Sequence, residues 1–148
     1  MTDAELFALC LESEAGGEST EGKQAVAQVI LNRMARKYQS DGTVAGTILH
    51  PSAFSGFWFS MIDGHYVRDC HTLDEAKAKA ETMLIKAKET SVWPVCVMVA
   101  DQALGGDIPT EPALSKAILY YNPKISNPVW ADPAKEVAAI GQHVFLSA

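Results

Sequence analysis

The sequence predicts a mainly α-helical α+β domain with a small β element near its C-terminus. Apolar residues recur at helical spacing through most of residues 2–104, and capping residues open several of these segments. Two short apolar and aromatic runs follow closer to the end, at 118–121 and 144–146. The chain has 148 residues and shows no internal repeat or linker, so we expect one domain over 1–148.

The first two helices carry clear boundary signals. Thr2-Asp3-Ala4-Glu5 has the pattern of a capping box, and Gly16-Gly17 ends the helix that it opens. Ser19-Thr20 can cap a second helix, whose apolar positions continue until near Tyr38. These signals predict two consecutive helices separated by a glycine turn.

The rest of the chain follows in order. A short helical turn is expected over 44–50, and the aromatic-rich stretch 51–69 is expected to be irregular. Helices are predicted from 73 to about 90 and from about 94 to 104. The two predicted strands are then separated by a loop with three prolines.

Composition excludes several classes of function. The net charge is −6 and no Lys/Arg cluster exists to neutralise phosphates, which argues against a nucleic-acid partner. No apolar run reaches the roughly 18 residues that span a bilayer, so membrane insertion is not expected. The histidines and cysteines form no HExxH motif and no paired spacing, so no metal and no cofactor is expected. Cys10, Cys70 and Cys96 are expected to be buried, reduced thiols.

Glu14 occupies an unusual place in the first helix. It follows Phe7 by seven residues, which puts it about 20° from Phe7 around the helix, on the apolar side. Burial and the negative C-terminal end of the helix both disfavour the charged carboxylate and raise its pKa. A carboxyl that keeps its proton can act as a general acid. The alternative is that Glu14 pairs with a buried Arg33 and only holds the fold, although Glu18 could equally pair with Arg33.

Several motifs occur in one order along the chain. The segment 14–33 reads Glu-Ala-x-Gly-Glu, then Glu-Gly-x-Gln-Ala-Val-Ala, then Leu-Asn-Arg. Phe54-Ser55, the run AILYYNP at 117–123, Trp130 and the segment 140–145 follow. Together they resemble the spore cortex-lytic type of cell wall hydrolase, a family that also appears in phage endolysins. The resemblance covers about residues 4–146, with departures at Ser13, Gly16, Ala53 and Lys116 and an altered stretch at 111–115.

The resemblance implies a lysozyme-like fold and an activity. Members cleave the glycan strand of peptidoglycan between N-acetylmuramic acid and N-acetylglucosamine, and their catalytic glutamate corresponds to Glu14. Because we find no convincing second carboxylate and interpret Glu18 as structural, a lytic transglycosylase is favoured over a muramidase that uses the same acid. A non-catalytic wall-binding relative is the alternative from another class.

Further residues are predicted to bind the substrate or support the site. Tyr120, Tyr121 and Asn122 are expected on the opposite wall of the cleft, and strand alternation allows only one tyrosine to face inward, for which Tyr120 is favoured. Ser55 with Phe54, and His143, are further candidates for substrate binding. Glu18 and Arg33 are predicted to support the structure. Trp58 and Trp130 are either sugar-stacking or packing residues.

The expected setting is phage lysis. The N-terminus is acidic, unlike a secretory signal, so we expect the chain to fold in the host cytoplasm. A holin would then release it to the periplasm or cell wall. We expect a monomer whose partner is the glycan strand.

Overall fold

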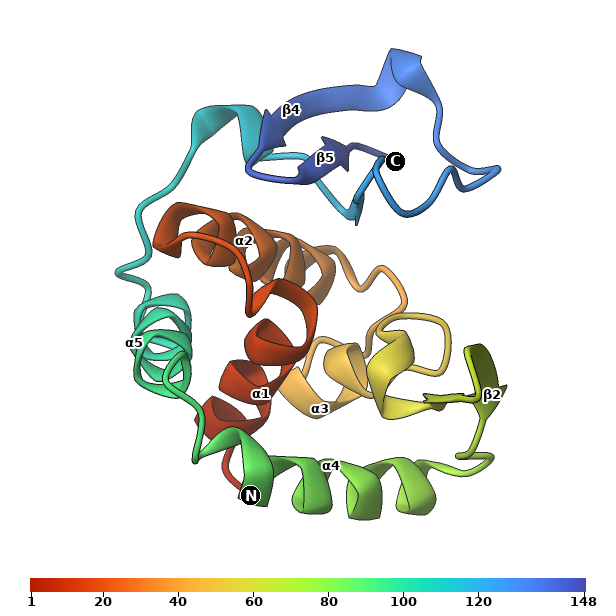
Figure 1. Ribbon diagram of the computed structural model, residues 1–148. Helices are drawn as coiled ribbons and strands as arrows, with labels where there is room; N and C mark the ends of the chain where they lie inside the picture. Colours follow the sequence, from red (N-terminus) through yellow and green to blue (C-terminus); the bar gives the residue numbers. More distant parts are fainter.

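The computed structural model describes residues 1–148, and five α-helices form its body. These are α1 (Asp3–Ala15), α2 (Thr20–Arg36), α3 (Val44–Ile48), α4 (Leu73–Ala87) and α5 (Trp93–Leu104). Helix α1 contacts the other four helices and lies at the centre of the helical body in Figure 1. Its apolar side chains, including fully buried Phe7 and Leu11, form the middle of the hydrophobic core.

The predicted helix boundaries are confirmed closely. The Thr2 hydroxyl accepts a hydrogen bond from the Glu5 amide, and the Glu5 carboxylate accepts one from the Thr2 amide, which completes the capping box. The Ser19 hydroxyl accepts from the Gly22 amide at the start of α2. Helix α2 ends at Arg36 because Lys37 adopts a left-handed conformation with φ 53°.

The stretch 51–69 is only partly irregular, which corrects the prediction. After the 3-10 helix η1 (Ser55–Phe57), strands β1 (Phe59–Ile62) and β2 (His65–Arg68) pair as an antiparallel hairpin. The turn between them is Asp63-Gly64, where both residues have positive φ, at 50° and 80°. An Asp-Gly pair is a strong hairpin signal, and it outweighs the irregular structure that the aromatic-rich composition of the stretch suggests.

A three-stranded antiparallel sheet forms the C-terminal part. Its strands are β3 (Leu119–Tyr121), β4 (Glu136–Ile140) and β5 (His143–Leu146), in the order β3-β5-β4. The two strands expected at 118–121 and 144–146 are confirmed, whereas β4 was expected to be loop. Two 3-10 helices, η2 (Pro112–Leu114) and η3 (Pro133–Lys135), precede β3 and β4. In Figure 1 the sheet lies on the side of α2 that faces away from α4.

The structure also bears on two simpler predictions. Cys10, Cys70 and Cys96 are buried and unbonded, as expected. No helix combines the length and the apolar character that crossing a membrane requires.

Candidate active site

A cleft runs between the helical body and the C-terminal sheet. Its larger hollow has a volume of about 540 Å³ and includes Glu14, Arg33, Ser55, Tyr120 and Trp130 in its lining. A smaller hollow of about 200 Å³ lies beside it and is lined by residues of the α1–α2 turn and of the sheet loops. Glu14 lines both hollows, so the two adjoin at this residue.

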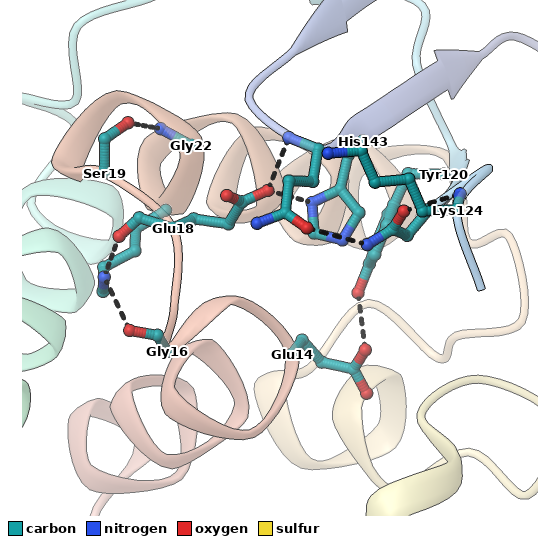
Figure 2. A network of polar contacts seen from close by, with 11 residues as sticks. Glu14, Gly16, Glu18, Ser19, Gly22, Tyr120, Lys124 and His143 are labelled. Atoms are coloured by element: carbon teal, nitrogen blue, oxygen red, sulfur yellow. Dashed lines mark hydrogen bonds and ion pairs between the residues drawn. The ribbon is translucent and has the colours of Figure 1, made fainter.

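Glu14 lies on the helical side of this cleft and is hydrogen-bonded by a residue of the sheet on the other side. Its side chain projects from the last turn of α1, and the Tyr120 hydroxyl donates a hydrogen bond to Oε2 at 3.0 Å (Figure 2). Burial raises the pKa of Glu14 above its ordinary value, although the Tyr120 hydrogen bond and the nearby Arg33 charge partly oppose this. The direction is the one that the helical position predicts, and it favours a protonated carboxyl.

Arg33 does not form an ion pair with either glutamate. Its Nε donates to the Ile118 carbonyl at 2.7 Å, and its guanidinium carbon lies 5.3 Å from the centre of the Phe54 ring. No carboxylate oxygen comes within ion-pair distance of it, so neither of the two alternative pairings of Arg33 is formed. The side chain is buried, and it acts on Glu14 only through its charge.

Glu18 contacts the turn between β4 and β5 instead. Its Oε1 accepts a hydrogen bond from the Gln142 amide at 3.0 Å and lies 3.2 Å from His143 Nδ1. Lys23, buried on α2, donates through Nζ to the Gly16 and Glu18 carbonyls of the glycine turn. The Lys23 bonds tie the α1–α2 turn to α2, and the Glu18 contacts tie it to the sheet, which places Glu18 in a supporting position.

The two tyrosines of β3 lie on opposite faces, as alternation requires. Tyr120 points at Glu14, whereas Tyr121 packs edge-on against Trp130 with ring centres 5.9 Å apart. Tyr121 lines neither hollow. The preference for Tyr120 as the inward residue is therefore confirmed, and the structure leaves Tyr121 outside the cleft that the sequence assigned to it.

The remaining candidates divide between the two hollows. Ser55 is exposed at the rim of the larger one, while Phe54 lies beneath it and is 2% exposed. Asn122 lines the smaller hollow, where its amide donates to Gln142 Oε1 at 3.3 Å. His143 lines the same hollow.

The two tryptophans have different surroundings. Trp58 is 2% exposed and buried in the core, so it cannot stack on a sugar from solution. Trp130 is 46% exposed and lines the larger hollow, where a sugar face could reach it.

Three residues of the site carry no clear sequence signal. Tyr38 and Gln39 line the larger hollow just after α2, and Gln142 lines the smaller one. The sequence indicates Tyr38 only as the end of a helix. Gln39 has a positive φ of 45°, which no sequence pattern predicts for glutamine.

Comparison with known proteins identifies the family. The sequence model of the cell wall hydrolase family matches residues 17–146. The chain belongs to the cell wall hydrolase family. The match begins three residues after Glu14 and includes Glu18, Arg33, Tyr120 and His143. The family prediction and the prediction of an enzyme that cleaves cell wall are confirmed.

Solved structures resemble the chain over almost its whole length. The catalytic domain of the germination-specific lytic transglycosylase SleB from Bacillus anthracis is 24% identical, with a TM-score of 0.65, over 98% of this chain and 93% of that one. The catalytic domain of SleB from Bacillus cereus is 25% identical, with a TM-score of 0.62, over 98% and 89%. These likenesses confirm the predicted α+β, lysozyme-like fold. No curated protein matches the sequence.

Proposed function

We propose that this cell wall hydrolase is a lytic transglycosylase, which cleaves the peptidoglycan strand between N-acetylmuramic acid and N-acetylglucosamine. The observation that carries the proposal is Glu14, which lines both hollows and whose carboxyl has a raised pKa. A glycan strand lying across both hollows would place one glycosidic oxygen beside it. The proposal is supported by the solved relative from Bacillus anthracis, whose title names a lytic transglycosylase.

Glu14 acts in both halves of the proposed reaction. Protonated Glu14 donates its proton to the glycosidic oxygen, and the bond from that oxygen to C1 of the muramic acid breaks through an oxocarbenium-like state. The resulting carboxylate then removes the proton of the C6 hydroxyl, whose oxygen bonds to C1. The products are a free 4-hydroxyl and a 1,6-anhydro ring, Glu14 is protonated again, and no water is consumed.

The arrangement of carboxylates favours this route over hydrolysis. Glu14 is the one Asp or Glu that lines the larger hollow. Glu18 lines the smaller hollow, but its carboxylate already contacts the Gln142 amide and His143. A hydrolase with two catalytic carboxyl groups needs a second one free to act as nucleophile or to activate water. Muramidase activity through the same Glu14 is the second candidate.

Other cleft residues would bind the sugars. Trp130 offers a half-exposed ring in the larger hollow, and the Ser55 hydroxyl lies at its rim. Asn122 and His143 offer polar atoms in the smaller hollow, on the other side of Glu14. We propose that sugars on either side of the cleaved bond contact these residues.

Digestion of purified peptidoglycan tests the proposal. Three proteins are incubated with the wall: wild type, Glu14→Gln and a control, Glu21→Gln, at an exposed residue in the first turn of α2. The masses of the released muropeptides are then measured. We expect anhydro-muramic products, lighter by one water than reducing ends, from wild type and the control alone. Reducing ends would indicate a muramidase, release by Glu14→Gln would exclude Glu14, and binding without release by any protein would indicate a wall-binding relative.

We propose phage lysis as the biological setting, with folding in the host cytoplasm, release by a holin and action as a monomer on the wall. The motifs shared with endolysins support this proposal. Expression in a bacterial host with and without a holin tests it, because turbidity should fall only when both genes are induced. Lysis without the holin would contradict the proposed route, and sedimentation of the purified protein tests the monomer.

A further inference from the structure

Two carboxylates flank the double glycine after α1, and the sheet holds them in different ways. Tyr120 on β3 donates to Glu14, whereas Glu18 contacts the β4–β5 turn and His143 at its end (Figure 2). Both glutamates line the smaller hollow. The mechanism proposed above uses Glu14 and leaves the second carboxylate without a chemical task.

The β4–β5 turn is shaped around the Glu18 carboxylate. Gly141 has a φ of 59°, and a Cβ atom there would lie 3.0 Å from Glu18 Oε2 and 3.1 Å from Oε1. The next residue, Gln142, donates its amide to Oε1. A glycine at this position therefore satisfies both the left-handed backbone and the close approach of the carboxylate. The side chain of Glu18 is 9% exposed, so it is largely withdrawn from water.

Glu18 is also the one acceptor beside a buried nitrogen. His143 Nδ1 is buried and forms no hydrogen bond, but Glu18 Oε1 lies 3.2 Å from it, within ion-pair distance. A negative charge this close to Nδ1 favours the imidazole tautomer that carries its proton on this nitrogen. The charge of the carboxylate therefore biases the tautomer of the ring.

The His143 ring in turn packs against the tyrosine that holds Glu14. The rings of His143 and Tyr120 meet edge to face, with centres 5.0 Å apart and planes at 68°. The Phe145 ring packs beside both of them, with its centre 5.8 Å from that of Tyr120 and 6.1 Å from that of His143. Tyr120 then donates to Glu14 at 3.0 Å. A continuous set of contacts therefore joins the two glutamates through His143 and Tyr120.

We propose that Glu18 is a positioning residue, which fixes His143 with its proton on Nδ1 and thereby holds the Tyr120 hydroxyl on Glu14. The kinetic part of this proposal rests on the proposed function, whereas the tautomer part does not. A glutamine at position 18 can still accept from the Gln142 amide, but its uncharged side chain selects the tautomer less strongly. The charge, and not only the hydrogen bond to the turn, is therefore what the site requires.

The charged surroundings of His143 agree with an uncharged ring at neutral pH. Burial lowers its pKa, and the Glu18 carboxylate opposes this. The Tyr120 ring faces it from β3, and Glu14 on α1 lies beyond the Tyr120 hydroxyl. Without the Glu18 charge the pKa of His143 falls further, so the neutral ring persists to lower pH.

Nitrogen-15 NMR of the imidazole and steady-state kinetics test the proposal together. Wild type, Glu18→Gln and the control Glu21→Gln are compared at pH 7 on glycan strands of defined length. We expect His143 to carry its proton on Nδ1 in wild type and in the control, and to become a mixture of tautomers in Glu18→Gln, with shifted Tyr120 ring signals. We expect kcat of Glu18→Gln to fall about ten- to hundredfold while KM changes little, since a small misplacement of catalytic groups has this effect.

Two results would overturn the positioning role. One is a wild-type His143 that carries its proton on Nε2, which is decisive even where Glu18→Gln fails to fold. The other is a folded Glu18→Gln with wild-type tautomer, Tyr120 signals and kcat. A wild type that cleaves no glycan would instead overturn the proposed function, and the NMR result would still decide the tautomer.

Discussion

Replacing Tyr120 by phenylalanine isolates the hydrogen bond that holds the catalytic carboxyl. The change removes one oxygen and keeps the ring, so the packing of Tyr120 against His143 and Phe145 is preserved. The hydroxyl donates to Glu14 Oε2 at 3.0 Å, and both residues are half-buried. The variant therefore leaves Glu14 in the same half-buried place without its donor.

The size of the effect follows from the kind of hydrogen bond. A hydrogen bond to a group that becomes charged contributes about 1.5–3 kcal/mol, and this one strengthens as Glu14 ionises in the transition state. Its loss therefore lowers kcat about ten- to hundredfold. The hydroxyl also lowers the pKa of Glu14, so its removal raises that pKa further.

The pH profile shows whether Tyr120 acts through Glu14. Protonated Glu14 is the proposed acid, so activity is lost as pH rises through its pKa. In Tyr120→Phe the alkaline limb of the kcat profile should move to higher pH while the maximum falls. The assay is release of soluble muropeptides across a pH series. A lower maximum with an unmoved alkaline limb would refute the reasoning, because Tyr120 would then act on the substrate and not on Glu14.

Three further predictions concern stability and binding. Burial raises the pKa of folded Glu14, so the folded state binds the proton more tightly and stability falls as pH rises between the unfolded and folded values. Glu14→Gln should therefore melt about 2–4 °C higher than wild type at pH 7 by calorimetry, and an equal or lower melting temperature would contradict this. Arg33→Met removes the donor to the Ile118 carbonyl and should lower the free energy of unfolding by about 1–3 kcal/mol in urea, whereas an unchanged value would mean that water replaces the contact. Trp130→Ala should raise KM and leave both kcat and stability nearly unchanged, because the ring is half exposed; a lower kcat at unchanged KM would argue against sugar stacking.

The sequence predicts the helical body well because its signals are local. The capping box at Thr2 and Glu5 and the apolar periodicity of α1 and α2 depend on residues within a turn or two. Strand β4 has no such signal. Its Val-Ala-Ala core has weak strand propensity, and it forms because β5 pairs with it from across the Gly141-Gln142 turn.

The site was predictable in its centre and not in its connections. The angular position of Glu14 around the axis of α1, close to that of Phe7, indicates a buried carboxyl. Alternation along β3 indicates that one tyrosine faces inward. The partners of Arg33 and Glu18 could not be inferred, because these partners lie far from Arg33 and Glu18 along the chain. Arg33 donates to Ile118, 85 residues later, and Glu18 accepts from Gln142, 124 residues later. Spacing within a helix carries no information about such contacts.

The cleft joins parts of the chain that the helical body alone would not hold together. Glu14 ends α1, whose carbonyl groups make that end of the helix negative, so the carboxyl is placed where its ionisation is least favourable. Its opposing groups, Tyr120 and the buried Arg33 charge, come from the sheet and from α2. Arg33 is itself fixed by the Ile118 carbonyl, which directly precedes β3. Docking of the sheet therefore delivers the hydrogen-bond donor and fixes the nearby positive charge in one step. The pKa of Glu14 is consequently a property of the assembled domain, because Tyr120, which opposes the rise caused by burial, reaches α1 only when the sheet lies against α2.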